Sequence, residues 1–432
     1  MQTTDYTRWF RGSTPYISAH RNKTFVILLT GAAFEHNNLT NIVHDIALLH
    51  VLGVRIVLVY GARPQIEAQF DTQKYHRNRR ITRKADMEKI TGVHGQLRAK
   101  LEALFSTGLP NTPLHNVDVP VVSGNFVTAQ PVGVIDGMDH LFTGQVRSVE
   151  HERINRVLET GGLLLQAPIG YSPSGQAFNL NAEELAAQIA VKINADKLIS
   201  LDALSYIADE AGQRISTFTP TELEQRIEKD RSDQRHRIDC LIRAVRGGVA
   251  KSHLIGFADD GALLAELFTA EGVGTQIVER ARKPVRTARL EDVSGIVEVI
   301  RPLEESGALV RRERYRLEQE ISYFLVAELD GIVVGCCAIY PYGTKAELAC
   351  VAVHENYRAQ SGAGIGSSLL EAAENKARAR GISELFVLTT QTRDWFLEQG
   401  FEDSNIDALP VERQELYNWQ RNSKVMCKTL SP

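Results

Sequence analysis

Apolar residues in the first two-thirds of the chain alternate between short unbroken runs and helically spaced sets. Thr24–Leu29 is a short apolar run, which predicts a buried strand. The apolar positions of Asn38–Leu52 follow helical spacing and stop at Gly53, and Val54–Val59 is a second strand-like run. A strand, a helix and a strand joined by short connections predict a parallel βαβ unit with a right-handed crossover.

The same alternation continues further along the chain. Strand-like runs occupy Val119–Val122, Leu163–Gln166 and Lys197–Ser200, and a helical pattern covers Ala182–Asn194. We therefore expect the first part of the chain to form one α/β domain, with a mostly parallel sheet covered by helices on both faces.

A second pattern begins after Glu279–Pro284, a polar stretch that ends in proline and is typical of a linker. Phe324–Leu329 and Ile332–Ile339 flank Asp330-Gly331, which predicts a β-hairpin. This part has more antiparallel character than the first. Its other predicted elements are strands at Val285–Ala288, Glu347–Val353 and Leu385–Leu388 and helices at Asp292–Ile300 and Gly366–Arg380.

These patterns predict an N-terminal segment over residues 1–21, a first domain over 22–279, a linker over 280–284 and a second domain over 285–432. The second domain is expected to be a smaller α/β domain with a mixed sheet. The apolar fraction of 43% and the charged fraction of 24% argue against a largely disordered chain.

Charge and cysteine content exclude several classes of function. The formal net charge is −4, which gives no overall attraction to nucleic acid or to an anionic membrane. The five cysteines are sparse and show no C-x-x-C spacing, so we expect neither a disulfide scaffold nor a zinc site, and no metal is predicted. The start shows no signal peptide and no run is long enough for a membrane helix, so we expect a cytoplasmic protein.

The segment Ala349–Gly366 carries the most informative chemistry. A predicted strand enters a loop with Gly362, Gly364 and Gly366, and this loop opens a helix. Glycines let backbone N–H groups approach a ligand closely, and the helix N-terminus adds partial positive charge, so together they can hold phosphate oxygens. Taken alone, these glycines also fit a tight turn, and they match neither a Walker A loop nor the dinucleotide motif.

In its wider context the segment resembles motif A of the GCN5-related N-acetyltransferase (GNAT) family. Gly364 and Gly366 match the motif's glycines, with Ser361 at its first position. Trp395–Phe401 resembles motif B, with Phe396 in place of the tyrosine that often acts as general acid, and Arg286–Asp292 resembles the family's first strand and turn. The resemblance implies that acetyl-CoA is a co-substrate, without any cofactor. It assigns acetyl-CoA binding to Cys350, Val351, Ala352, Val353, Gly362, Gly364, Ile365 and Gly366.

In acetyl transfer from a thioester, an amine must lose a proton and attack the carbonyl carbon. The oxyanion of the tetrahedral intermediate must then be stabilised until the thiolate leaves. Glu347 is the candidate base. The alternative explanation is that Glu347 is only a solvated glutamate at a strand edge. Tyr417 or Thr389 is the candidate acid. Cys350 is better explained as a small buried apolar residue than as a catalytic thiol.

Two separated arginine clusters can clamp a dicarboxylate substrate through paired hydrogen bonds. Arg311 and Arg312 form the first cluster, and Arg421, helped by Ser423, lies in the basic C-terminal tail. Each cluster taken alone also fits a solvated surface.

The first domain resembles the amino-acid kinase family, especially acetylglutamate kinase. That family's first strand usually ends in Lys-x-Gly-Gly, but here Leu28 replaces the lysine and Thr30 a glycine. Its second glycine loop has become Gly61-Ala-Arg-Pro64, and Glu183 stands where an aspartate is usual. These losses at phosphoryl-transfer positions argue against an active kinase.

The end of the first domain resembles the arginine-binding segment of arginine-sensitive acetylglutamate kinases. A carboxylate and loop carbonyls suit a guanidinium, which only donates hydrogen bonds. The alternative explanation is that Glu266 is a charged residue on a helix face and that Gly272 and Gly274 are ordinary loop glycines. The N-terminal segment resembles a mobile helix that lines this site and joins neighbouring dimers. The effector residues implied are Tyr16, His253, Glu266, Gly272, Gly274 and Thr275.

The two domains together resemble the bacterial N-acetylglutamate synthases. The resemblance implies acetylation of the α-amine of L-glutamate, feedback inhibition by L-arginine and a homo-oligomer, expected to be a hexamer. Three alternatives remain open. They are an acetylglutamate kinase with an accessory domain, a non-catalytic arginine sensor, and an acetyltransferase for another amine.

Overall fold

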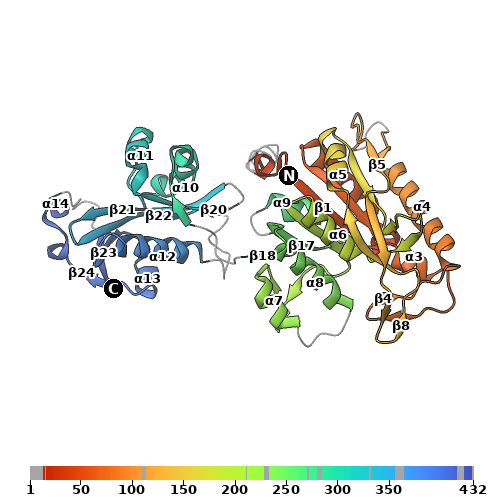
Figure 1. Ribbon diagram of the computed structural model, residues 1–432. Coiled ribbons are helices and arrows are strands. Elements are labelled where there is room, and N and C mark those ends of the chain that lie inside the picture. Colours follow the sequence, from red (N-terminus) through yellow and green to blue (C-terminus); the bar gives the residue numbers. More distant parts are fainter. Residues whose placement is uncertain are drawn as a thin grey trace. The chain divides into compact units, whose positions relative to one another are not determined.

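The computed structural model (Figure 1) describes residues 13–14, 16–108, 113–210, 212–227, 233–269, 272–279, 285–329, 332–355, 364–415 and 423–430. The chain forms two compact units, Met1–Ala281 and Arg282–Pro432. The division lies between residues 281 and 282, inside the stretch that the sequence indicates as a linker.

An eight-stranded sheet forms the centre of the first unit, in the order β16-β18-β17-β13-β1-β2-β10-β5. Strands β1 and β2 pair in parallel and are joined through α2, which confirms the predicted βαβ unit. Only the β17–β18 pair is antiparallel among the described strands of this sheet. The strands are β1 (Thr24–Leu29), β2 (Arg55–Tyr60), β5 (Val121–Ser123), β10 (Leu163–Gln166), β13 (Lys197–Asp202), β16 (Thr217–Phe218), β17 (Lys251–Gly256) and β18 (Thr275–Val278).

Helices cover both faces of this sheet and make three layers. Phe25 and Ile27 of β1 pack into one apolar core, whereas Val26 and Leu28 pack into another, because successive strand side chains point to opposite faces. The first core includes α2 (Leu39–Val51), α4 (Asp86–Phe105) and α9 (Ala262–Phe268). The second includes α5 (His151–Glu159), α6 (Ala182–Lys192), α7 (Pro220–Ile227) and α8 (Asp233–Arg246).

A smaller sheet of the first unit, with the order β12-β11-β6-β9, was not among the predicted elements. Its strands are short or rich in polar residues, so their hydrophobic pattern is weak. They are β6 (Val127–Pro131), β9 (Gly144–Val149), β11 (Ile169–Tyr171) and β12 (Ala177–Asn179). Further short elements are α3 (Arg63–Glu67) and the two-residue strand pairs β3 (Tyr75–His76) with β4 (Arg79–Arg80), β7 (Val134–Ile135) with β8 (Met138–Asp139), and β14 (Ile207–Ala208) with β15 (Arg214–Ile215).

The second unit is a seven-stranded mixed sheet in the order β19-β20-β21-β22-β23-β25-β24. Strands β20 and β21 form the predicted hairpin, and only β22 and β23 run parallel among the described strands. Its strands are β19 (Val285–Thr287), β20 (Phe324–Leu329), β21 (Ile332–Tyr342), β22 (Lys345–Val353), β23 (Glu384–Thr389), β24 (Glu402–Ser404) and β25 (Lys424–Thr429).

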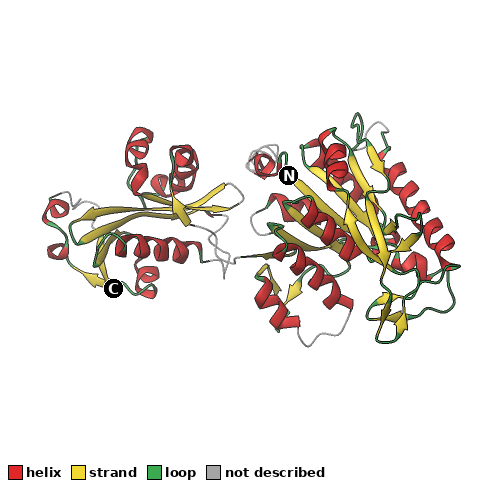
Figure 2. Cartoon of the chain, viewed as in Figure 1, coloured by secondary structure: helices red, strands yellow, loops and turns green. Residues whose placement is uncertain are grey.

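Helices lie on both faces of the second sheet (Figure 2). Cys336 of β21 packs with α10, while the neighbouring Cys337 contacts Leu369 of α12. The helices are α10 (Val293–Glu305), α11 (Arg314–Glu320), α12 (Ile365–Arg378), α13 (Arg393–Glu398) and α14 (Val411–Gln414). In the described part of either unit, no helix combines the length and the apolar character needed to cross a bilayer.

Candidate active site

Two parallel strands in the middle of the second sheet separate after a short paired stretch. Strand β22 pairs with β23 at Lys345, Ala346 and Glu347, and in the described residues the pairing stops there, although β22 continues to Val353. The backbone groups of β22 beyond Glu347 that face β23 therefore have no ladder partner on that strand. Such groups can bind the amides of an extended ligand that lies between two strands.

The same part of β22 contains a bulge. Cys336 pairs with Ala352 and Ala338 with Ala349, so Cys350 and Val351 together lie opposite a single residue of β21. The backbone of Cys350 takes a left-handed conformation with φ of 54°, which is uncommon for residues other than glycine and asparagine. Bulges bend a strand and redirect its groups. The bulge thus lies within the predicted acetyl-CoA-binding residues Cys350 to Val353.

Helix α12 begins just after the glycine loop. Gly364 precedes the helix with φ of 42°, Ile365 is its first residue, and Gly366 lies in the first turn. A Cβ on Gly366 would come within 3.1 Å of Trp395, so glycine permits close contact with the indole. The free N–H groups of this helix start suit an anion. Gly362 lies outside the described residues.

Glu347 is buried rather than solvated at a strand edge. The residue is only 8% exposed, and its carboxylate accepts two hydrogen bonds from Arg413, from Nε to Oε2 at 2.6 Å and from Nη2 to Oε1 at 3.0 Å. These bonds raise the pKa of Arg413, so its guanidinium stays charged. Each carboxylate oxygen retains a further lone pair for a water or an amine.

Arg312 lies in the segment before α11, half-buried and near enough to Cys350 to interact with it electrostatically. Its backbone N–H donates to Glu304 Oε1 at 2.8 Å, which fixes the chain at this point. Burial opposes the charge of Arg312, but Cys350, Tyr340 and Glu320 outweigh it and raise the pKa of the guanidinium. Arg312 is therefore a charged group near the bulge, whereas Arg311 is exposed.

Thr389 ends strand β23 and is 7% exposed. Its hydroxyl accepts from the backbone N–H of Thr392 at 3.0 Å and shares a hydrogen bond with the Thr392 hydroxyl at 2.9 Å. Thr389 pairs with Lys424, the first residue of β25, which brings the preceding Ser423 to the same end of the sheet. Tyr417 and Arg421 lie outside the described residues.

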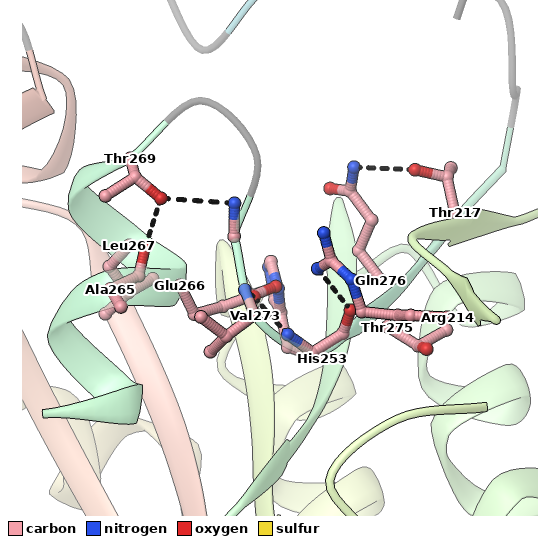
Figure 3. Close-up of polar contacts among 12 residues, drawn as sticks. Arg214, Thr217, His253, Ala265, Glu266, Leu267, Thr269, Val273, Thr275 and Gln276 are labelled. Carbon is pink, nitrogen blue, oxygen red and sulfur yellow. Dashed lines mark hydrogen bonds and ion pairs between the residues drawn. The ribbon is translucent and has the colours of Figure 1, made fainter. Parts of the chain in front are cut away.

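Of the predicted effector residues, His253, Gly272 and Gly274 meet around the carboxylate of Glu266, and Figure 3 shows His253 and Val273 beside it. His253 Nδ1 lies 2.7 Å from Glu266 Oε1, and the N–H groups of Val273 and Gly274 donate to Oε2 at 2.7 and 2.8 Å. A Cβ on Gly272 would lie 2.4 Å from that oxygen, so glycine is required for the close approach. Glu266 therefore organises the loop that follows α9.

Burial and hydrogen bonding fix the charges of this pair. Burial raises the pKa of Glu266, but His253 and the two backbone donors outweigh it, so the pKa lies below its usual value. Burial is the main cause that lowers the pKa of His253. The pair thus consists of an ionised carboxylate and a neutral imidazole at neutral pH.

The loop carbonyls are expected to accept hydrogen bonds from the guanidinium of a bound arginine. One of them already accepts a hydrogen bond from an arginine of the chain itself. Arg214 Nη1 donates to the carbonyl oxygen of Gly274 at 3.1 Å. Thr275 joins the loop to neighbouring strands, because its hydroxyl donates to the Ile215 carbonyl at 2.8 Å and accepts from the Ile207 N–H at 2.9 Å. Tyr16 is half-buried in the N-terminal segment. That segment reaches α9 through His20, whose Nε2 lies 2.8 Å from the Leu267 carbonyl oxygen.

Sequence reasoning missed two arginines of these sites. Arg413 holds Glu347, and Arg214 contacts the effector loop. Neither residue belongs to a short motif, and each comes from a segment far along the chain from its partner. In the described residues there is also no group of three or more side chains arranged to hold a metal ion.

Comparisons with known proteins agree with this two-part architecture. The amino acid kinase family profile matches residues 23–256, and the acetyltransferase (GNAT) family profile matches residues 290–401. The chain is 45% identical to an amino-acid acetyltransferase from Pseudomonas syringae pv. tomato, over 99% of this chain and 100% of that protein. It is 43% identical to the enzyme of that name from Yersinia pseudotuberculosis, over 99% of both chains.

A solved structure agrees as well. N-acetylglutamate synthase from Neisseria gonorrhoeae, complexed with coenzyme A and L-arginine, matches with a TM-score of 0.87 and 35% identity, over 99% of this chain and 100% of that chain. The same enzyme complexed with coenzyme A and N-acetyl-glutamate matches with a TM-score of 0.64 and 36% identity, with the same coverage. The chain therefore belongs to the amino-acid acetyltransferase family, with an amino-acid-kinase-like domain followed by a GNAT domain.

Proposed function

We propose that this protein transfers the acetyl group of acetyl-CoA to the α-amino group of L-glutamate, and that L-arginine regulates the reaction through the first unit. The observation that carries the proposal is the full-length similarity to amino-acid acetyltransferases and to an N-acetylglutamate synthase that binds coenzyme A, L-arginine and N-acetyl-glutamate. We propose for this protein an N-terminal segment over residues 1–21, a regulatory domain over 22–279, a linker over 280–284 and an acetyltransferase domain over 285–432.

Acetyl-CoA binds at the separated strands and the start of α12. The backbone of Cys350, Val351, Ala352 and Val353 forms hydrogen bonds with the pantetheine amides and the thioester oxygen, because this stretch of β22 has no partner on β23. The loop containing Gly362 and the helix start at Gly364, Ile365 and Gly366 hold the pyrophosphate. Fixed backbone donors also stabilise the oxyanion that forms during transfer.

Glu347 removes the proton of the glutamate ammonium through a water. Arg413 holds the carboxylate in place and leaves each oxygen one free lone pair. The deprotonated amine attacks the thioester carbon, the C–S bond of the resulting intermediate breaks, and the thiolate of CoA leaves. Thr389 or Tyr417 supplies the proton that this thiolate takes up, and regains one from the attacking nitrogen, which loses its second proton as the amide forms.

Arginines hold the carboxylates of glutamate. Arg312 is the charged group near the bulge, and Arg421 with Ser423 completes the clamp, with Arg311 beside it. Paired hydrogen bonds from a guanidinium to a carboxylate give both affinity and orientation.

Arginine binds in the first unit beside Glu266, with Tyr16, His253, Gly272, Gly274 and Thr275. Because the chain's own donors use the Glu266 oxygens and Arg214 uses the Gly274 carbonyl, arginine binding must exchange some of these contacts. A ligand that prefers the rearranged loop regulates the enzyme by shifting the balance between the two states. We further propose a cytoplasmic hexamer, and the five free cysteines are compatible with a reducing compartment.

The decisive experiment follows the free CoA thiol released from acetyl-CoA with L-glutamate, with and without L-arginine. Glutamate-dependent release that arginine suppresses supports both parts of the proposal. If L-arginine does not change the release of CoA, the proposed regulation by L-arginine is wrong. If glutamate gives no release, the substrate assignment is wrong.

A further inference from the structure

The positive charge of Arg312 is not compensated by a carboxylate in the part of the chain that the structure describes. Its guanidinium is half-buried and forms no ion pair with any described residue. Other arginines of the second unit are each paired with a carboxylate: Arg314 with Glu318, Arg316 with Glu320 and Arg413 with Glu347. A partly buried cation without a counter-charge is suited to binding an anionic ligand.

Glu320 is a carboxylate that could cancel this charge, since it lies close enough to Arg312 to interact with it electrostatically. Burial raises the pKa of Glu320, but the hydrogen bonds from Tyr340 and Arg316 outweigh it, so the carboxylate is ionised at neutral pH. Arg316 Nε donates to Oε1 at 2.8 Å, and the Tyr340 hydroxyl donates to Oε2 at 2.5 Å. Both oxygens of Glu320 are therefore held by groups other than Arg312.

Tyr340 interacts with both charges. Its hydroxyl has one proton, which it donates to Glu320, so towards the Arg312 guanidinium the same oxygen can only act as an acceptor. Burial and the bond to Glu320 both raise the pKa of Tyr340, so the phenol remains protonated and neutral at pH 7. Tyr340 thus gives Glu320 a donor and gives Arg312 a neutral acceptor that leaves its charge uncancelled.

The strand register also places Tyr340 beside the candidate base. Tyr340 of β21 lies directly opposite Glu347 of β22, and opposite residues of an antiparallel pair present their side chains on the same face. The Tyr340 ring packs against the core below α10 and against the Tyr323 ring, with a centroid distance of 5.3 Å. Its hydroxyl therefore has a fixed position on the face of the sheet that carries Glu347.

We infer that Tyr340 is a positioning residue that keeps Arg312 from pairing with Glu320, and so leaves the guanidinium available to a carboxylate of the substrate. If Arg312 paired with Glu320, the substrate would have to displace an internal carboxylate, and its binding would weaken. This inference rests on the proposed function, because it concerns how L-glutamate is held. It adds a residue that acts through Arg312 and does not itself touch the substrate.

The test is the steady-state kinetics of glutamate-dependent CoA release by the full-length protein. Tyr340→Phe keeps the ring and removes only the hydroxyl, so Glu320 loses a donor and becomes free to pair with Arg312. We expect the KM for L-glutamate to rise about three- to tenfold, while kcat and the KM for acetyl-CoA change by less than about twofold.

The double variant Tyr340→Phe/Glu320→Gln makes the test specific for charge. An amide at position 320 cannot neutralise Arg312, so the KM for L-glutamate should return to within about twofold of the wild-type value. A hydroxyl that served only packing would give no such recovery, because the second substitution would remove a further contact. Tyr323→Phe is the matched control, because it removes a hydroxyl from the ring packed against Tyr340, and it should leave both KM values unchanged.

The kinetics separate failure of this inference from failure of the proposed function. The inference is wrong if wild-type protein is active and Tyr340→Phe keeps the wild-type KM for L-glutamate, if both KM values rise alike, or if the double variant shows no recovery. Wild-type protein that releases no CoA with L-glutamate would overturn the substrate assignment and this inference with it.

Discussion

Glu347 in the second unit and Glu266 in the first are both buried, yet their partners differ in kind. Glu347 accepts two hydrogen bonds from one arginine side chain, and it lies where two strands separate. Glu266 accepts from two backbone N–H groups of a loop and contacts a buried histidine. A side-chain partner can move without changing the fold, whereas backbone partners tie the carboxylate to the loop's conformation. We therefore expect the Glu347 carboxylate to exchange partners during a reaction and the Glu266 carboxylate to hold the loop in one conformation.

The largest expected effect comes from Glu347→Gln. We expect kcat for glutamate-dependent CoA release to fall by about 10²–10⁴-fold, because the amide cannot accept a proton, and the acidic limb of the pH profile to flatten. Steady-state kinetics across pH measure both effects.

The matched control is Glu384→Gln, which removes a carboxylate on the neighbouring strand that pairs with Lys345. This variant should retain its activity and its pH profile. If Glu347→Gln also keeps the wild-type pH profile, Glu347 does not act as the base and resembles Glu266 in serving structure.

Arg312→Gln should have a smaller and more selective effect. We expect the KM for L-glutamate to rise about ten- to a hundredfold while that for acetyl-CoA changes little, because one charge-assisted contact to a carboxylate is lost. The exposed neighbour Arg311→Gln is the control and should change the KM less. The same selectivity is expected for Arg421→Ala. Equal increases in both KM values would contradict the clamp.

Glu266→Gln should change the stability of the first unit and its response to arginine more than catalysis. We expect the free energy of unfolding at neutral pH to fall by about 1–3 kcal/mol, because the loop donors lose a charged acceptor. The pKa of Glu266 is lower in the folded protein than its ordinary value of 4.5, so its contribution is complete above that value. The contribution disappears as the pH falls through the lower, folded pKa.

Denaturant unfolding at several pH values measures this difference, and CoA release measures the loss of arginine inhibition. Glu159→Gln is the control, because Glu159 is exposed at the end of α5. An unchanged stability together with full arginine inhibition would show that Glu266 neither holds the loop nor contributes to the effector site.

Much of the fold follows from local patterns. The predicted strand Thr24–Leu29 matches β1 at both ends, and the predicted helix at Ala182–Asn194 matches α6 closely, because a fully buried strand and an amphipathic helix leave strong periodic signals. The β6–β9 sheet and helix α4 were not predicted. Strand β6 is short and partly exposed, and α4 mixes polar and apolar positions along its length.

The candidate sites divide in the same way. The glycines of the loop before α12 and the loop after α9 were predicted, because each belongs to a motif that is continuous in sequence. The bulge at Cys350 has no sequence signal, since it depends on the register between β21 and β22. The Glu347–Arg413 pair joins residues 66 positions apart, and neither residue marks the other in the sequence.

Two α/β domains, the loss of the kinase lysine at Leu28 and the glycine loop before α12 can be predicted from the sequence, because these features depend on neighbouring residues and on hydrophobic periodicity. Which charges are compensated, by contrast, depends on how distant segments pack together. This packing pairs Arg413 with Glu347, satisfies Glu266 with loop amides and leaves Arg80 without a carboxylate partner among the described residues. An ion pair needs only closeness in space, and distant segments come together only when the whole sheet and its covering helices have formed.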